Sequence, residues 1–467
     1  MRKSLIILLG AALAGLLATG CDLEAPGHST LSVEQPSGAA VFGNYVAVGN
    51  SLTAGFMDSG LILTGQATSY PQLIATQMGY PAGSFMQPLL APPGLGSTAL
   101  TNPMYRAGVL HYDAMAGSIA VLDSTHITEI QPLALAASWP VPYSNLGVPG
   151  ATLKDFADAL DSSTSQSPGN AFFDLILRNS VFGGYSMLEQ LIARGPTICT
   201  FWLGNNDVLG GATSGQPNDG VVHAGEAVNL TPPSLFTAMY GAALDNITNG
   251  VMERHGFAPV IFVANIPSIT SVPFFMPKAL FAQASGIPEG MLAMEESDAQ
   301  IVLFTALGYL RAHGGLAALP LPAEYTLSVA EAQLVANTVT SYNSAIAAAV
   351  GARSNVFLYD ANAELAALDP MTEAAHFLVL ASAVGPQTAA ATTLFSLDGV
   401  HPNNRGYARV ANGFLNAMNA QLGTDFPMVD LATVSWDPTH GTGYGTISST
   451  TVTVSERAAA TMSAVFR

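Results

Sequence analysis

The chain has 467 residues, of which 49% are hydrophobic and only 10% are charged. Its 32 acidic and 14 basic residues give a formal net charge of −18 at pH 7, and a surface of that charge repels nucleic acid phosphates and anionic lipid headgroups. We therefore exclude nucleic acid as a partner. The length and apolar content allow a large hydrophobic core, and the low charge density argues against disorder.

The N-terminus predicts export and lipid attachment. Arg2 and Lys3 precede an apolar run from Leu5 to Ala18, which is followed by Thr-Gly-Cys with the cysteine at position 21. A basic segment, a short apolar segment and small residues are typical of a signal peptide, and the run is too short to span a membrane. The sequence ending at Cys21 resembles the lipobox of bacterial lipoproteins, whose cysteine is lipidated and becomes the first mature residue. The alternative is an ordinary secretory signal in which Cys21 has no role.

The lipobox resemblance implies that residues 1–20 are a signal peptide and that residues 21–40, rich in Ser, Pro and Gly, are a tether. We expect an exported protein of the bacterial cell envelope, anchored through lipid on Cys21 at the periplasmic face or the cell surface. The mature chain then retains Cys199 besides the lipidated cysteine. Cys199 lies in an apolar run, and we expect it to be inert core.

After the tether, short apolar runs alternate with longer helical stretches. The predicted strands are Tyr45–Val48, Tyr143–Leu146, Thr197–Leu203, Pro259–Asn265 and Asn355–Asp360. The predicted helices are Ser69–Met78, Ser186–Ala193, Ser234–Arg254, Val329–Val350 and Asn404–Leu422. Strands that are apolar on both faces and alternate with helices indicate a parallel sheet covered on both sides. We therefore predict a three-layer α/β/α sandwich of flavodoxin-like type, in a single domain at residues 41–424.

Three stretches exceed what this core needs, at residues 80–140, 209–233 and 272–326. Long insertions are more often functional or separately structured than idle. The third stretch contains several apolar patches and is predicted either to form a lid or acyl-binding wall, or to supply extra helices that pack on the core. Residues 425–467 form a tail of unknown role, with a possible hairpin at 446–454.

Ser51 and His401 each lie in a short turn-like motif. Ser51 directly follows the first predicted strand, and His401 lies three positions after Asp398. A serine on a strand-to-helix turn can project its hydroxyl from the sheet edge, and a carboxylate three residues before a histidine can orient the ring as a general base. Considered separately, a helix cap and an Asp-Gly turn are the simpler interpretations. The serine turn has Thr53 where the G-x-S-x-G elbow of α/β-hydrolases has glycine.

Two further motifs lie between these residues in the chain. Asn206 belongs to a GNND turn at 204–207 that follows a very apolar strand, and Gly150 ends a GVPG turn at 147–150. An amide at a strand end can donate a hydrogen bond to a developing oxyanion, and glycine lets the backbone N–H approach a ligand closely. The alternatives are a polar turn and an ordinary loop glycine. In a parallel sheet, residues that follow the strands meet at one edge, where ligands bind.

In order and type, the four motifs resemble those of the SGNH hydrolases, also called the GDSL family of lipases and esterases. The resemblance extends from about Tyr45 to Leu422. It implies Ser51 as the nucleophile, His401 as the base and Asp398 as the acid that orients the base. It also implies an oxyanion hole formed by the N–H groups of Ser51 and Gly150 and the side-chain amide of Asn206.

The chain departs from the family pattern in two respects. Asn50 stands where the family name has aspartate, which affects hydrogen bonding at the serine turn and leaves the triad acid unchanged. The intervals from Ser51 to Gly150 and from Asn206 to Asp398 are also longer than a compact member needs. The inserted segments in these intervals are expected to shape the substrate pocket.

We therefore predict a serine hydrolase that cleaves carboxylic esters through an acyl-enzyme on Ser51, without a metal or organic cofactor. The apolar insertions favour lipid or other apolar acyl esters. One alternative is an acyltransferase that uses the same residues on envelope glycans or lipids. Another is a non-catalytic lipoprotein that binds lipid or glycan, which the presence of Ser51, Asp398 and His401 disfavours. The sequence carries no indication of an oligomeric state.

Overall fold

A computed structural model describes most of the chain. The described ranges are residues 38–92, 94–97, 109–113, 118–121, 138–167, 169–381 and 393–437. The predicted signal peptide, Cys21, nearly all of the predicted tether and the possible hairpin at 446–454 lie outside these ranges.

The core of the fold is a five-stranded sheet in which every paired neighbour is parallel. Its strands are β1 (Tyr45–Gly49), β6 (Asn145–Gly147), β7 (Ile198–Trp202), β8 (Val260–Ala264) and β12 (Val356–Tyr359). Their spatial order is β12-β8-β7-β1-β6. Numbered by their order in the chain, the strands run 2-1-3-4-5 from the β6 edge, which is the flavodoxin-like arrangement. The predicted parallel α/β/α sandwich is confirmed.

The strands are buried on both faces because their side chains alternate between two apolar layers. In β7, Cys199 and Phe201 pack in one hydrophobic cluster, and Ile198 and Trp202 pack in the other. This two-sided burial explains why the strands appear in the sequence as continuous apolar runs.

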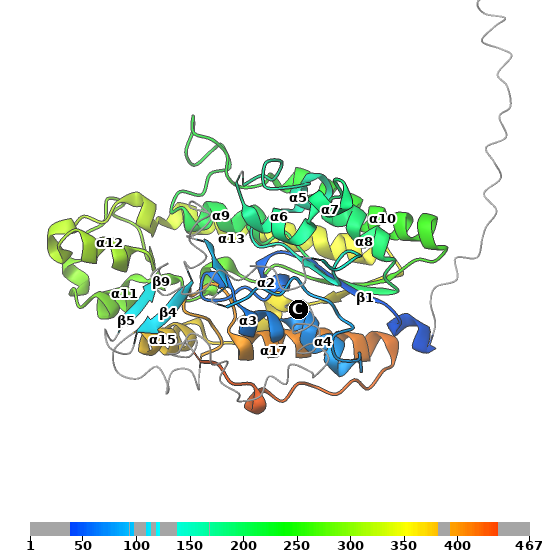
Figure 1. Cartoon of the computed structure of the whole chain (residues 1–467). Helices are drawn as coiled ribbons and strands as arrows, with labels where there is room; N and C mark the ends of the chain where they lie inside the picture. The colour runs from blue at the N-terminus through cyan, green and yellow to red at the C-terminus, as the bar shows by residue number, and fades with distance from the viewer. Residues whose placement is uncertain are drawn as a thin grey trace, which may run out of the picture.

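Helices cover both faces of the sheet (Figure 1). Those on the face of Cys199 and Phe201 are α5 (Leu153–Asp158), α6 (Ala171–Leu177), α8 (Met187–Arg194), α9 (Asn206–Thr213), α10 (Pro233–His255) and α13 (Val329–Gly351). Those on the opposite face include α4 (Tyr70–Gln77) and α17 (Asn404–Leu422).

Local signals set several helix ends. Ser186 and Glu189 form a capping box at the start of α8, and Gly195 ends that helix with a φ of 60°.

Short helices complete the described elements of the sandwich. They are α2 (Ser51–Ala54), α3 (Leu63–Ala67), α7 (Asn179–Phe182) and α14 (Ala361–Ala366), with 3₁₀ turns at η1 (Gly38–Phe42), η4 (Ile269–Ser271) and η8 (Leu431–Thr433). The longer helix α15 (Pro370–Ala381) packs against the lobe that is described next.

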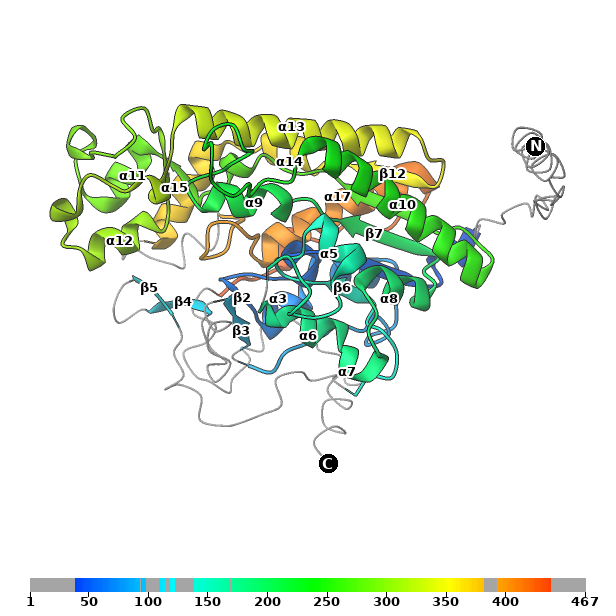
Figure 2. The same cartoon turned by 90° about the horizontal axis from the view of Figure 1, so that it is seen from above.

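The third predicted insertion forms a lobe at one end of the sandwich, at the left in Figure 2. Its elements are β9 (Phe275–Pro277), α11 (Lys278–Ser285), η5 (Glu289–Met291), β10 (Ile301–Leu303), α12 (Ala306–Ala312), η6 (Gly315–Ala318), η7 (Ala323–Tyr325) and β11 (Thr326–Leu327). The three strands pair as an antiparallel sheet, and residues such as Met276, Phe281 and Val302 form an apolar core of the lobe. The insertion is therefore a structured unit and not a set of helices laid on the central sheet.

The described parts of the first insertion take part in two small antiparallel sheets, one of them formed with β2 from the preceding segment. One pairs β2 (Gly60–Leu61) with β3 (Leu95–Gly96), and the other pairs β4 (Leu110–Asp113) with β5 (Ser118–Val121). Ile119 of β5 packs with the apolar core of the lobe. The first and third insertions therefore meet at the same end of the sandwich.

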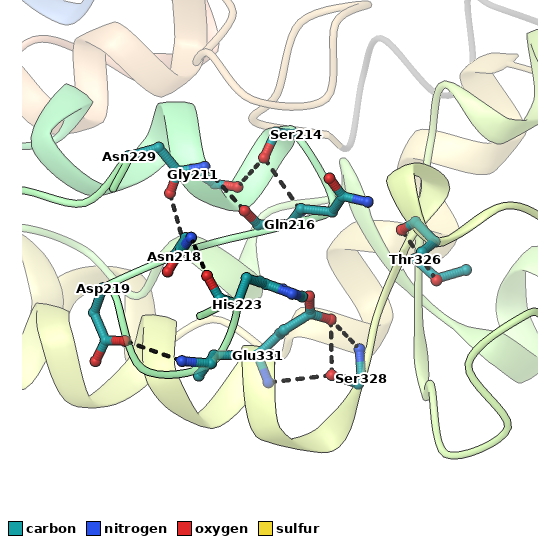
Figure 3. Close-up of polar contacts among 12 residues, drawn as sticks. Gly211, Ser214, Gln216, Asn218, Asp219, His223, Asn229, Thr326, Ser328 and Glu331 are labelled. Atoms are coloured by element: carbon teal, nitrogen blue, oxygen red, sulfur yellow. Dashed lines mark hydrogen bonds and ion pairs between the residues drawn. The ribbon is translucent and has the colours of Figure 1, made fainter. Parts of the chain in front are cut away.

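The second predicted insertion is a polar loop held against the start of α13 (Figure 3). His223 Nε2 lies 2.6 Å from Glu331 Oε1, and the other Glu331 oxygen accepts hydrogen bonds from the backbone N–H and hydroxyl of Ser328. Within the loop, the Asn218 N–H donates to Asn229 Oδ1 at 2.7 Å. Glu331 therefore caps α13 and anchors the insertion at the same time. The sequence interpretation did not identify this acidic partner of His223.

The packed core extends past residue 424, where the predicted domain ends. The rings of Phe42 and Phe426 meet edge to face at 4.9 Å, and Val429 is buried in the apolar layer beneath α17. Residues 425–437 thus belong to the globular unit. Among the helices in the described ranges, none combines the length and hydropathy needed to cross a bilayer.

Candidate active site

Ser51 lies at the carboxyl end of β1, between β7 and the edge strand β6, as the first residue of α2. The preceding residue caps this helix, since Asn50 Oδ1 accepts a hydrogen bond from the Leu52 N–H at 3.0 Å. The Asn50 amide also donates to Asn205 Oδ1 at 3.3 Å, which joins the serine turn to the turn after β7. The first N–H groups of a helix have no partner within that helix, so the Ser51 N–H is free of intrahelical bonding. Asn50 thus supports the turn where the family name has aspartate.

The structure brings Ser51, His401 and Asp398 together although the chain separates the serine and histidine by 350 positions. His401 Nε2 lies 2.9 Å from Ser51 Oγ, and His401 Nδ1 lies 3.0 Å from Asp398 Oδ2. With Nδ1 donating to the carboxylate, Nε2 is the nitrogen that accepts the serine proton. These three residues therefore have the geometry of a nucleophile, a general base and an orienting acid.

Asp398 is buried and surrounded by hydrogen-bond donors. Its Oδ1 accepts from the N–H groups of Val400 at 2.9 Å and His401 at 2.8 Å, and its Oδ2 accepts from the Ser59 N–H at 2.9 Å. Burial by itself raises the pKa of Asp398, but the interaction with His401 and the backbone donors outweigh it and hold the pKa at about 2. The residue is therefore a carboxylate throughout the neutral range and can stabilise the imidazolium that forms during catalysis.

The loop that carries Asp398 is held by a segment that the sequence interpretation did not identify. Asp58 Oδ1 accepts a hydrogen bond from the Leu397 N–H at 2.7 Å, and the Asp58 N–H donates to Ser396 Oγ at 3.1 Å. Asp58 and Ser59 have φ values of 55° and 60°, a left-handed conformation that is unfavourable for residues other than glycine. Two consecutive residues are thus held in a strained conformation where they support Asp398 and its loop. A turn-forming Asp-Ser-Gly at 58–60 is the signal in the sequence that marks this segment.

Phe56 is a second residue missing from the sequence interpretation. Its ring centroid lies 4.7 Å from that of His401, with the two planes inclined by 53°. The backbone carbonyl of Phe56 accepts a hydrogen bond from the Tyr407 hydroxyl at 2.5 Å, which fixes this part of the chain against α17. Phe56 therefore covers the imidazole and limits its rotation.

Gly150 and Asn206, the predicted oxyanion donors, line the same cavity as Ser51. Gly150 has a φ of 82°, and a β-carbon there would lie 2.8 Å from Asn170 Nδ2. The Asn170 amide donates to the Pro149 carbonyl at 2.8 Å and so fixes the peptide before Gly150. Asn206 Nδ2 donates one hydrogen to the Ala151 carbonyl at 2.8 Å, and a primary amide carries a second hydrogen. Asn170 is a further residue that sequence reasoning missed.

Asp207, the last residue of the GNND turn, has a structural position. Its two oxygens accept hydrogen bonds from the Leu153 N–H and the Thr231 hydroxyl, both at 2.9 Å. Burial raises the pKa of Asp207 to about 6 despite these donors. Asp207 therefore ties the turn that carries Asn206 to the start of α5 and to the end of the second insertion.

A cavity of about 1210 Å³ opens beside Ser51. Apolar side chains of the lobe form part of its wall, among them Phe274, Leu280, Phe304 and Leu307. Its volume exceeds the 300–1,000 Å³ typical of small-molecule sites. Within the described ranges, no group of three or more His, Cys, Asp and Glu side chains is arranged to hold a metal ion. Cys199 is fully buried in β7, which raises the pKa of its thiol, and it lies apart from the cavity lining.

Comparisons with known proteins place the chain in a family. A search of solved structures finds similarity to an alpha/beta hydrolase enzyme from the metagenome of Lake Arreo, Spain, with 11% sequence identity and a TM-score of 0.31, over 82% of this chain and 96% of that one. No curated protein matches the chain. The sequence model of the GDSL-like lipase/acylhydrolase family matches residues 45–414, which contain all four motifs. The chain therefore belongs to the GDSL-like lipase/acylhydrolase family and is a hydrolase.

Proposed function

We propose that this hydrolase cleaves carboxylic esters through a covalent acyl-enzyme on Ser51. Ser51 Oγ attacks the ester carbonyl carbon while His401 Nε2 takes the hydroxyl proton. The tetrahedral oxyanion accepts hydrogen bonds from the N–H groups of Ser51 and Gly150 and from the Asn206 amide. His401 then gives its proton to the departing alkoxide, and a water molecule activated by the same imidazole releases the acid.

The observation that carries this proposal is the continuous hydrogen-bond chain from Asp398 through His401 to Ser51, with distances of 3.0 and 2.9 Å. This chain ends at the wall of the large cavity, where a substrate has access to the hydroxyl. Acyl transfer requires a nucleophile, a base and oxyanion donors around one reacting atom, and the residues supply all three.

The apolar wall of the cavity supports a preference for esters with a large apolar part. Phe274 and Phe304 come from the lobe, and Phe172 comes from the sandwich. Burial of a methylene group against such a surface contributes about 0.8 kcal/mol. Longer apolar chains are therefore expected to bind more tightly in this cavity.

The test is hydrolysis of nitrophenyl esters with acyl chains of two to sixteen carbons, with kcat/KM as the readout. Ser51→Ala is expected to lower kcat by more than about 10⁴-fold. Ser97→Ala is the matched control, because Ser97 lines the same cavity but bonds neither His401 nor Asp398. A fluorophosphonate probe should add its mass to the wild-type protein and not to Ser51→Ala. Equal turnover by wild type and Ser51→Ala would overturn the assignment.

We further propose that the protein is anchored to a membrane of the cell envelope by lipid on Cys21. The basic, apolar and small residues that precede Cys21 support this proposal. In cells fed labelled palmitate, the wild-type protein should carry the label in the membrane fraction, and Cys21→Ser should be unlabelled. A labelled Cys21→Ser protein would contradict the anchor site.

A further inference from the structure

Ser51 and His401 belong to the walls of two cavities. Besides the large cavity, they line a second one of about 120 Å³, and Asn206 lines both. The second cavity is bounded by η4, α14 and the start of α17, all part of the sandwich, and the lobe residues Leu280 and Leu307 of the large cavity are absent from its wall. The nucleophile and base are thus shared by two spaces that different parts of the chain build.

The small cavity is suited to an apolar group. Its wall includes Leu52, Ile269, Ala361, Leu365 and Leu394. Most of the exposed wall is apolar, although Asn50, Asn205, Asn206 and Ser268 also line it, and its two charged residues bond to each other.

Those charged residues are Arg409 and Glu364. Arg409 Nε lies 2.9 Å from Glu364 Oε1, and the Tyr359 hydroxyl donates to Glu364 Oε2 at 2.6 Å. The opposite charges of this pair therefore compensate each other at one side of the cavity.

The two volumes differ about tenfold, 120 Å³ against 1210 Å³. An apolar protein cavity of about 150 Å³ holds one benzene molecule, which has six heavy atoms. The small cavity therefore accommodates about five or six carbon atoms. The large cavity accommodates a substituent many times that size.

We propose that the enzyme is specific for asymmetric esters, in which one side is an apolar group of at most about six carbons and the other side is large. This inference rests on the proposed ester hydrolysis at Ser51. When the carbonyl carbon bonds to Ser51 Oγ, its acyl and alkoxy substituents diverge, and the two cavities that share Ser51 and His401 receive one each. The volume of the small cavity limits the length of the substituent that it can bury.

Two ester series test this limit, with proton release as the readout. In one series, methyl esters carry acids of two to sixteen carbons; in the other, acetate esters carry alcohols of the same lengths. The rate of hydrolysis is expected to persist at all lengths in one series, and to fall at least tenfold beyond about six carbons in the other. Esters with sixteen carbons on both sides should be hydrolysed at least tenfold more slowly than the best long substrate. Equal tolerance in both series, or the same limit in both, would overturn the inference.

A variant in the small cavity tests the location of the limit. Leu365→Ala removes three carbon atoms from its wall and is expected to move the limit up by two or three carbons. Leu188→Ala is the matched control, because Leu188 is also a half-buried helical leucine but lines neither cavity. A limit that does not move in Leu365→Ala would also overturn the inference.

The two proposals fail in different ways. Loss of all ester turnover, or turnover that persists in Ser51→Ala, would contradict the ester hydrolysis itself. Turnover that depends on Ser51 but shows no length limit would contradict the asymmetric specificity alone.

Discussion

Substitution of Gly150 by alanine should separate catalysis from stability. The new β-carbon would lie 2.8 Å from Asn170 Nδ2, well inside van der Waals contact, and Asn170 is itself held by its hydrogen bond to the Pro149 carbonyl. The backbone at Gly150 also has a φ of 82°, where a residue with a β-carbon costs roughly 1–2 kcal/mol. The peptide must shift, and with it the N–H proposed to stabilise the oxyanion.

Loss of one oxyanion donor raises the barrier by about 2.7–4 kcal/mol, equivalent to about 10²–10³-fold in kcat. We therefore expect Gly150→Ala to lower kcat by about 10²-fold on a short nitrophenyl ester. KM should change little, because the donor acts on charge that develops in the transition state. Steady-state kinetics and a thermal melt of the same preparation measure the two effects separately.

Gly183→Ala provides the control for backbone strain. Gly183 has a φ of 79°, and a β-carbon there would meet no atom within 4 Å. This variant should lose a similar amount of stability and retain the wild-type kcat. If kcat of Gly150→Ala stays within threefold of wild type while its melting temperature falls like that of Gly183→Ala, Gly150 is not an oxyanion donor.

Three other outcomes are expected. Asp398→Asn should lower kcat by about 10³–10⁴-fold, since an amide does not hold the His401 tautomer or stabilise its charged form. A smaller loss of kcat in steady-state assays would assign Asp398 a lesser role. Glu296 lies in the lobe between η5 and β10. Burial, and then the nearby Glu331 carboxylate, raise the pKa of Glu296 to about 7, so the folded state favours its protonated form and loses stability as the pH rises from about 4.5 to 7. Glu296→Gln should therefore have the melting temperature of wild type at pH 4.5 and a higher melting temperature than wild type at pH 8. Equal melting temperatures of the variant and wild type at both pH values would contradict the raised pKa. Asn50→Asp should keep kcat within a few-fold of wild type, because aspartate can also accept the hydrogen bond that caps α2, and a large loss of kcat would show that the Asn50 amide itself is required.

Much of the fold could be predicted because its strands are buried on both faces and appear as continuous apolar runs. The prediction was least accurate at Tyr143–Leu146, where the structure has a strand at Asn145–Gly147. Tyr143 packs under the Arg178 guanidinium, 3.8 Å from the ring centroid, and the Ser144 N–H donates to the Met86 carbonyl of the first insertion. These residues are buried by packing outside the sheet, and an apolar pattern does not distinguish that burial from strand pairing.

The predicted site residues could be named because each lies in a short local motif. The supporting residues could not, because their roles depend on contacts between distant segments. Asp58 acts on a loop 338 positions away, and Asn170 acts through the backbone of Pro149. The sequence indicated the lobe only by its excess length and its apolar patches. Its three-stranded sheet depends on strands of two and three residues that carry little periodic signal.

The attachment of the Asp398 loop to Ser59, 339 positions earlier in the chain, has a consequence for folding. Contacts of such sequence separation form late, because the intervening chain must first be ordered. During refolding, helical circular dichroism should recover before ester hydrolysis. Enzymatic activity therefore reports the final docking of the C-terminal third of the chain onto the turn at Asp58 and Ser59, and a newly made chain remains inactive until that segment has been synthesised.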